Sequence, residues 1–265
     1  MTDLKKLTSE IEAIAREAGS FISKEALSFD IGRAEVKGLN NFVSYVDKGA
    51  EKIIVNKLTA LLPEAGFEAE EGTSDKRGKI YNWVVDPLDG TTNFMHGLPP
   101  YAVSIALREH DEPVAGAVFE ITRNEMFTGW KNGGAWLDGK IIHVSDAVKM
   151  SESLIATGFP YTDFSRFDGY MELFSWCCQH THGVRRLGSA ATDIAYVACG
   201  RFEGFYEYGL YPWDIAAATI ILREAGGRIS DFSGNEKALT GSEIIAASEA
   251  VFLEMLKIVS NFMKK

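Results

Sequence analysis

The sequence feature that most constrains the fold is an apolar run that ends in two closely spaced aspartates. Residues Tyr81 to Val85 are aromatic and β-branched, which is typical of a buried strand. The segment Asp86-Pro87-Leu88-Asp89-Gly90-Thr91-Thr92 follows directly. Pro87 stiffens the turn, and Gly90 allows a close approach of the backbone. This arrangement predicts a strand that delivers Asp86 at its end, where Asp89 can converge with it on a hard cation.

The same segment also predicts an anion site. Thr91, Thr92 and Asn93 are typical of the first turn of a short helix, which Pro99 would end. Backbone N–H groups at the start of a helix can hold a phosphate. One loop would then supply both cation ligands and a phosphate cradle. An ordinary β-turn with solvated acids has the same local pattern, so the loop alone leaves both interpretations open.

Three further acidic positions favour a metal site. The pair Glu70-Glu71 lies in a polar loop before the strand, Asp214 begins an apolar helix, and Asp47 opens another helix. Taken singly, each has a simpler explanation, as a solvated pair, a charge at a helix N-terminus or a cap. Together they form an oxygen-rich set without a plausible His or Cys cluster, which selects Mg²⁺ or Mn²⁺ over Zn²⁺. Several carboxylates around a phosphate cradle are what two-metal hydrolysis requires.

Hydrophobic periodicity predicts most of the remaining elements. Apolar residues recur every three or four positions from Leu4 to Ile22 and from Ala50 to Leu62, which indicates two amphipathic helices. Strands are expected over 101–107, 114–121 and 125–130, and the turn signals Asn132-Gly133-Gly134 and Asp138-Gly139 indicate a hairpin. Short strands then alternate with helices over 167–179, 189–199, 212–225 and 248–263. We expect one domain over residues 1–265, with an α+β half of about 1–145 and an α/β half of about 146–265.

Charge and composition exclude several classes of protein. The formal net charge of −10 repels nucleic acid backbones, so no nucleic acid partner is expected. The N-terminus lacks the apolar core of a signal peptide, and no apolar run reaches the roughly 18 residues of a membrane span. Cys177 and Cys178 are adjacent, and Cys199 makes the count odd, which favours reduced thiols. We therefore expect a cytoplasmic protein without a membrane partner.

Two signatures and their spacing resemble a known family. Residues 83–94 read WVVDPLDGTTNF, and a second motif begins at Trp213-Asp214-Ile215-Ala216-Ala217 and continues to Glu224-Ala225-Gly226-Gly227. The chain resembles the inositol monophosphatase family, within the lithium-sensitive, magnesium-dependent phosphatase superfamily. The acidic pair Glu70-Glu71 matches the same family, and Arg185-Arg186-Leu187-Gly188-Ser189-Ala190-Ala191 resembles its bacterial members. Order and spacing agree over essentially the full chain.

The resemblance implies a layered αβαβα sandwich and a site for two or three Mg²⁺ ions, which Mn²⁺ could replace. Glu70, Asp86 and the backbone carbonyl of Leu88 would hold one ion. Asp86, Asp89 and Asp214 would hold a second, with a weaker third ion near Glu70. Ions at these positions would also reverse the acidic charge that otherwise repels a phosphate ester.

The resemblance also implies roles in catalysis and substrate binding. Thr91, paired with Asp47, would orient the attacking water and help to deprotonate it, assisted by Glu70. The backbone of Gly90 and Thr91 would hold the phosphate. The positions that match substrate contacts in the family are Asp89, Gly90, Thr91, Gly188, Ser189, Ala190, Glu207 and Asp214.

The expected activity is hydrolysis of an inositol monophosphate to inositol and phosphate, in a homodimer inhibited by lithium. The substrate would be a small phosphorylated polyol or sugar, and fructose-1,6-bisphosphatase or broader sugar-phosphatase activity is the alternative. A regulatory, partner-binding protein that keeps the fold is the non-enzymatic alternative. Arg185 and Arg186 would either shape a subunit interface or approach the substrate.

Overall fold

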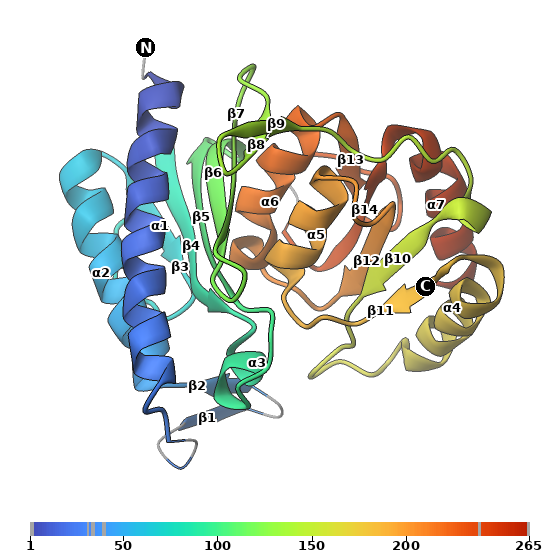
Figure 1. Cartoon of the computed structure of the whole chain (residues 1–265), viewed down its shortest axis with the longest axis horizontal. Coiled ribbons are helices and arrows are strands. Elements are labelled where there is room, and N and C mark those ends of the chain that lie inside the picture. The colour runs from blue at the N-terminus through green and yellow to red at the C-terminus, as the bar shows by residue number, and fades with distance from the viewer. Residues whose placement is uncertain (1–2, 31, 33–34, 39–40, 238–239, 264–265) are drawn as a thin grey trace.

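The chain folds into five layers that alternate helices and sheets. A computed structural model describes residues 3–30, 32, 35–38, 41–237 and 240–263. Two helices cover a seven-stranded sheet, two helices separate it from a five-stranded sheet, and two further helices cover the outside of that second sheet (Figure 1). The layered αβαβα sandwich expected from the sequence is therefore confirmed.

The first half builds the larger sheet, whose strand order is β3-β4-β5-β6-β7-β8-β9. Neighbouring strands are antiparallel except for β3 and β4, which run parallel. The helices are α1 (Leu4–Ala26), α2 (Tyr45–Leu61) and the short α3 (Thr91–Met95). The strands are β1 (Glu35–Gly38), β2 (Asn41–Val43), β3 (Gly66–Ala69), β4 (Tyr81–Asp89), β5 (Ala102–Glu109), β6 (Glu112–Glu120), β7 (Glu125–Trp130), β8 (Ala135–Leu137) and β9 (Lys140–Ile142), with β1 and β2 paired separately.

The second half builds the smaller sheet, whose strand order is β11-β10-β12-β14-β13. Strand β10 runs parallel to both of its neighbours, and β14 runs antiparallel to both of its own. The helices are the 3-10 helix η2 (Met150–Glu152), α4 (Phe167–His180), α5 (Ala190–Ala198), α6 (Pro212–Glu224) and α7 (Glu249–Phe262). The strands are β10 (Leu154–Thr157), β11 (Gly183–Arg185), β12 (Gly204–Tyr208), β13 (Gly227–Ser230) and β14 (Glu243–Ser248).

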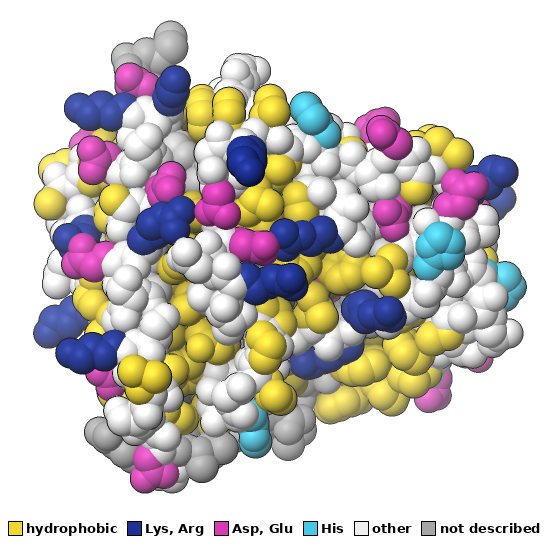
Figure 2. Space-filling model, viewed as in Figure 1, with side chains coloured by type: hydrophobic (Ala, Val, Ile, Leu, Met, Phe, Trp, Pro, Cys, Tyr) yellow, Lys and Arg dark blue, Asp and Glu magenta, His cyan; other side chains and the backbone are white. Residues whose placement is uncertain are grey.

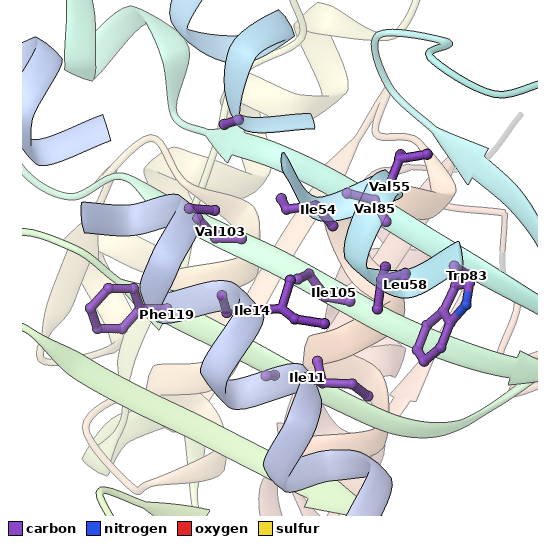
Figure 3. Packing of buried hydrophobic residues seen from close by; sticks show 14 of the residues in the cluster. Ile11, Ile14, Ile54, Val55, Leu58, Trp83, Val85, Val103, Ile105 and Phe119 are labelled. Atoms are coloured by element: carbon purple, nitrogen blue, oxygen red, sulfur yellow. The ribbon is translucent and has the colours of Figure 1, made fainter. Parts of the chain in front are cut away.

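The helices α1 and α2 bury their apolar faces against the larger sheet. Ile14 of α1 and Leu58 of α2 belong to one buried cluster with Ile105 and Trp83 of the strands, and Figure 3 shows these side chains at the interface between helices and sheet. Burying one such side chain contributes about 1.5–3 kcal/mol. Because α2 is held in this way, the polar residues at its start and on its first turns have a fixed position relative to β4.

The middle layer consists of α5 and α6, and α6 lies very close to the larger sheet. A Cβ atom added at Gly116 of β6 would lie 2.9 Å from the Cα atom of Ala217 in α6, which is closer than van der Waals contact allows. Glycine on the strand and alanine on the helix therefore permit this approach. This close packing places the N-terminus of α6 and Asp214 beside the end of β4 and the start of β5.

Most predicted elements are present near their predicted bounds, with two kinds of difference. The strand predicted over Tyr81–Val85 continues to Asp89, so Asp86 lies within the strand rather than at its end. Strands β1, β2, β3 and β11 were not predicted; each has only three or four residues, and none is marked by an apolar run or by flanking turn signals that were recognised in the sequence. The polar loop expected around Glu70 follows directly after β3.

Charged side chains of both signs occupy the surface (Figure 2). On the face shown in Figure 2, acidic and basic side chains are interspersed, with apolar side chains between them. Cys177, Cys178 and Cys199 are all unpaired, as the sequence predicts. None of the helices that the structure describes is long and apolar enough to span a membrane.

Candidate active site

A β-bulge near the end of β4 turns two aspartates toward the same side of the sheet. Asp86 is paired with Ser104 of β5 and Asp89 with Ala102, so three residue steps on β4 oppose only two on β5. Residues three apart on a regular strand point to opposite faces, and one extra residue cancels that alternation. The N–H of Leu88 donates to Oδ1 of Asp86 at 2.9 Å, inside the bulge. The irregularity thus places both carboxylates on one face.

The strand passes directly into α3 through a left-handed residue. Gly90 has φ +90, and a Cβ atom there would lie 3.0 Å from the carbonyl oxygen of Pro100, so glycine fits best. The first hydrogen bond of α3 runs from the N–H of Phe94 to the carbonyl of Gly90, at 3.0 Å. The earlier N–H groups of such a turn have no partner within the helix. They are the groups that the sequence predicts to hold a phosphate.

The side chain of Thr91 donates a hydrogen bond to Asp47 of α2. The hydroxyl of Thr91 has Oδ1 of Asp47 at 2.9 Å and the carbonyl oxygen of Leu88 at 3.0 Å as acceptors. Oδ2 of Asp47 accepts hydrogen bonds from the N–H and the hydroxyl of Ser44, at 2.8 and 2.5 Å. Asp47 therefore both caps α2 and contacts the loop. Burial raises its pKa, and the hydrogen bonds from Ser44 and Thr91 act in the opposite direction.

The side chain of Asp89, at the end of β4, reaches the N-terminus of α5, a helix of the second half of the chain. Its Oδ2 accepts a hydrogen bond from the hydroxyl of Ser189 at 2.7 Å and from the N–H of Ala191 at 2.8 Å. A carboxylate at a helix N-terminus is favoured by the helix dipole and its unpaired N–H groups. Asn93 links the same segments, because its amide donates to the carbonyl of Leu187 at 2.7 Å. The segment predicted to bind cations (86–92) and the segment predicted to contact the substrate (188–190) are therefore in direct contact.

Asp214 reaches the same place from the first turn of α6. Its Oδ2 accepts a hydrogen bond from the N–H of Tyr211 at 2.7 Å, which caps the helix. The hydroxyl of Ser104, opposite Asp86 on β5, donates to the carbonyl of Trp213 at 3.2 Å. This bond attaches the start of α6 to the strand beside the bulge. Asp214 therefore caps α6 and at the same time lies near Asp86.

Glu70 is placed by the parallel strand that the sequence did not reveal. Because β3 runs parallel to β4, the chain leaves β3 at the edge where β4 also ends, and Ala69 pairs with Val85. The N–H of Glu70 donates to the carbonyl of Val85 at 3.1 Å. Glu70 is near enough to Asp86 that its charge raises the pKa of that carboxyl, after burial itself.

The four carboxylates, of which Asp86 and Asp89 are buried and Glu70 and Asp214 half-buried, create a local excess of negative charge. The pKa of Asp86 is well above its ordinary value, through burial and then through Glu70, Asp89 and Asp214. Burial raises the pKa of Asp89 to about 6, against hydrogen bonds from Ser189 and the α5 N-terminus. Burial and then Asp89 raise the pKa of Asp214 to about 7. Uncompensated buried charge of this kind requires protons or cations.

Hard divalent cations fit this cluster by charge and donor type. Carboxylates and the Leu88 carbonyl are oxygen donors of the kind that Mg²⁺ and Mn²⁺ prefer. Within the described residues, no three His, Cys, Asp or Glu side chains already converge as ligands of one ion. Ion binding would therefore have to complete the convergence of the side chains.

A single pocket of about 140 Å³ collects the predicted residues. All of the site residues proposed from the sequence line it except Asp47, which lies behind Thr91. Glu207 on β12 is buried beside the same pocket, and burial raises its pKa well above the ordinary value. The pocket is lined by Glu70, Asp86, Leu88, Asp89, Gly90, Thr91, Gly188, Ser189, Ala190, Glu207 and Asp214, among other residues.

Tyr161 and Arg186 complete the rim of the pocket. Arg186 donates from Nη2 to the hydroxyl of Tyr161 at 2.7 Å, and both residues line the pocket. The guanidinium also lowers the pKa of Glu207 and of Asp89, against the stronger effect of burial. The sequence left the place of Arg186 open, and it is at the pocket. Tyr161 was not identified from the sequence, because no motif surrounds it.

Comparison with known proteins agrees with this geometry. The model of the inositol monophosphatase family matches residues 3–262, so the chain belongs to the inositol monophosphatase family. It is 38% identical over 246 residues to an inositol-1-monophosphatase of Mesorhizobium japonicum, covering 92% of each chain. It is 40% identical over 243 residues to the Nus factor SuhB of Escherichia coli K12, covering 91% of each chain. The crystal structure of the extragenic suppressor protein SuhB of Bartonella henselae superposes with a TM-score of 0.89 at 34% identity, over 96% of this chain and 98% of that one.

Proposed function

We propose that this protein is a magnesium-dependent phosphomonoesterase that hydrolyses an inositol monophosphate to inositol and phosphate. The observation that carries the proposal is the meeting of the carboxylates of β4, of α6 and of Glu70, which follows β3, beside the start of α3 in one pocket. Family membership supports a phosphatase in general, and the Mesorhizobium relative carries the name inositol-1-monophosphatase. The buried negative charge supports a requirement for divalent cations.

The cation ligands would be those that the sequence indicates. Glu70, Asp86 and the Leu88 carbonyl would hold one Mg²⁺, and Asp86 would share a second with Asp89 and Asp214. When bound, the ions would supply positive charge to the transferring phosphoryl group and lower the pKa of the attacking water. The α5 N-terminus would hold the Asp89 carboxylate in its ionised, ligating form, because its donors stabilise the negative charge.

The pair of Thr91 and Asp47 would orient the attacking water. A threonine hydroxyl has one hydrogen, and a carboxylate is a stronger acceptor than a carbonyl. With its hydrogen donated to Asp47 at 2.9 Å, the Thr91 oxygen is left to accept a hydrogen bond from water. Glu70 would help to remove the proton from that water. The N–H groups of Gly90 and Thr91 would hold the phosphate.

The alcohol portion of the substrate would lie against the wall of the pocket formed by the start of α5 and by β12. Gly188, Ser189 and Ala190 lead into α5, and Glu207 on β12 lines the same pocket. Because burial keeps the pKa of Glu207 well above its ordinary value, its carboxyl group can donate as well as accept a hydrogen bond to a hydroxyl group. A polyol such as inositol presents hydroxyl groups that suit this wall.

Turnover of a panel of phosphate esters tests the proposal. Purified protein is assayed with an inositol monophosphate, fructose-1,6-bisphosphate and glycerol 2-phosphate, with Mg²⁺ and with a chelator. We expect the highest kcat/KM for the inositol ester, and Asp89→Asn should reduce it by orders of magnitude, while the exposed Asp168→Asn should not. A strong preference for fructose-1,6-bisphosphate would overturn the substrate assignment, and Mg²⁺-independent turnover would overturn the mechanism.

A second candidate function is regulatory, because the relative from Escherichia coli carries the name Nus factor SuhB. The chain could then have a partner-binding role besides catalysis. Complementation separates the two functions. If a catalytically inactive Asp89→Asn variant restores growth of a strain that lacks this protein, the required role is not turnover; if only the active protein does so, the role is catalytic.

Three further properties belong to the same proposal and rest on family membership. We expect a homodimer, which sedimentation velocity would detect, and inhibition of turnover by Li⁺. We also expect the protein in the cytoplasmic fraction of cells.

A further inference from the structure

Glu51 is a buried carboxylate of α2 that binds the backbone of the loop after β3. Its side chain is fully buried. Its Oε2 accepts a hydrogen bond from the N–H of Glu71 at 2.7 Å, and its Oε1 accepts one from the N–H of Thr73 at 2.7 Å. Hydrogen bonds from N–H groups to an ionised acceptor are stronger than neutral ones, and more so away from water.

These two bonds hold the segment that carries Glu70. On one side, the N–H of Glu70 is attached to the carbonyl of Val85 in β4. On the other side, Glu51 accepts hydrogen bonds from the N–H groups of Glu71 and Thr73. Between them Gly72 turns the chain with φ +69. The Glu70 side chain is therefore bracketed by one attachment to the sheet and two to α2.

The same helix also holds the water-orienting pair. Asp47, which accepts the hydrogen bond from Thr91, precedes Glu51 by four residues, and residues four apart lie on one face of a helix. One face of α2 therefore contacts both the α3 loop and the loop after β3. Since α2 is packed against the sheet, it can keep these two loops in register.

We propose that Glu51 is a positioning residue, which fixes the loop of Glu70 and thereby sets the affinity for the ion that Glu70 would hold. The inference rests on the proposed function, because that function assigns Glu70 as a ligand. Groups that orient a metal ligand commonly change metal affinity by about 10–100-fold when they are substituted. Glu51 acts through the backbone of the loop and does not touch the reacting atoms.

The chain provides a matched control in Glu224, at the end of α6. Its carboxylate likewise accepts backbone hydrogen bonds, from the N–H groups of Asn132, Gly133 and Gly134 at 2.9–3.1 Å. That turn does not line the pocket. Substituting Glu224 therefore removes the same kind of interaction without touching the Glu70 loop.

The experiment compares Glu51→Gln, Glu51→Asp and Glu224→Gln with the wild type. Calorimetric titration of ion-free protein with Mg²⁺ or Mn²⁺ measures affinity, and amide hydrogen exchange reports the N–H groups of Glu71 and Thr73. For Glu51→Gln we expect faster exchange at both amides and about tenfold weaker ion binding, with kcat restored to within about threefold at saturating Mg²⁺. Glu51→Asp keeps a carboxylate on a side chain that is one methylene shorter, so its ion affinity and amide exchange should lie between those of the wild type and Glu51→Gln.

Glu224→Gln should speed exchange only in the turn at 132–134 and leave ion affinity unchanged. Unchanged ion affinity in both Glu51 variants, with faster exchange at Glu71 and Thr73, would overturn the proposal. The same holds if Glu224→Gln weakens ion binding as much as Glu51→Gln, since the effect would then be general destabilisation. A wild-type protein that binds no Mg²⁺ and hydrolyses no ester would instead overturn the proposed function, and this inference with it.

Discussion

Asp214→Asn should stabilise the ion-free protein while it removes metal-dependent function. The carboxylate of Asp214 has a pKa of about 7, raised first by burial and then by Asp89, against 3.8 for an ordinary aspartate. At pH 8 that difference corresponds to about 4 kcal/mol against the folded state. Asp214 is only half-buried and lines the pocket, so solvent screening makes this an upper limit, and about 2 kcal/mol is expected. Asparagine keeps the size and can still accept the Tyr211 N–H.

The sign of the effect depends on pH. Because the folded pKa is raised, the folded protein binds more protons than the unfolded chain between about pH 4 and 7. The cost of the charge is complete above pH 7 and disappears as the pH falls toward 3.8. The stabilisation by Asp214→Asn should therefore be largest at pH 8 and fall by more than half at pH 5. Mg²⁺ should reverse the ranking, because it stabilises the wild type only.

Urea denaturation in the presence of a chelator, at pH 8 and pH 5, measures both effects as changes in the free energy of unfolding. Asp168→Asn is the control, because Asp168 is an exposed acid in the first turn of α4. That substitution should destabilise slightly, by about 0.5 kcal/mol, since it removes a favourable helix-dipole interaction. If Asp214→Asn also destabilises the ion-free protein at pH 8, the carboxylate cluster is not electrostatically strained and the reasoning is refuted.

Three other expectations follow from the same geometry. Thr91→Val should lower kcat by about 100-fold or more while the melting temperature changes little, whereas Thr91→Ser should retain most activity, and steady-state kinetics distinguishes the two. The rise in melting temperature on adding Mg²⁺ should be larger at pH 8 than at pH 5.5. The reason is that protons compete with the ion for Asp89 and Asp214, whose pKa values are about 6 and about 7. An equal rise at both pH values would contradict ligation by these groups. Gly116→Ala should destabilise by about 1–3 kcal/mol in chemical denaturation, because its Cβ atom would lie 2.9 Å from the Cα atom of Ala217, and an unchanged midpoint would show that α6 can move away.

Much of the fold was predictable because it depends on local patterns. The three-to-four-residue periodicity located α1, and the β-branched run located β4, since each pattern reflects burial of one face. The loop from Asp86 to Thr92 could be singled out in the same way, because its carboxylates, proline and glycine are properties of individual residues. The structure gives Gly90 a positive φ, and it places Asp86 within β4 rather than at the end of the strand.

Four of the short strands were not predicted, and one of them, β3, matters for the site. Gly66–Ala69 is too short to show a period, and its parallel pairing with β4 depends on a partner more than ten residues away. That pairing decides where Glu70 lies. The sequence therefore identified the acidic pair but could not place it beside Asp86.

The sequence by itself determined which oxygen donors, backbone N–H groups and helices the protein would use. Only the tertiary structure decided which of them meet. Asp89 contacts Ser189 across 100 residues of chain, and Glu51 holds the loop of Glu70 from a different helix. Residue type and period are local properties, whereas these contacts depend on how sheets and helices stack into layers. For that reason the residue types of the candidate site could be recognised in the motifs, whereas the positions of Tyr161 and Arg186 at the pocket and the contacts of Glu51 became visible only in the folded molecule.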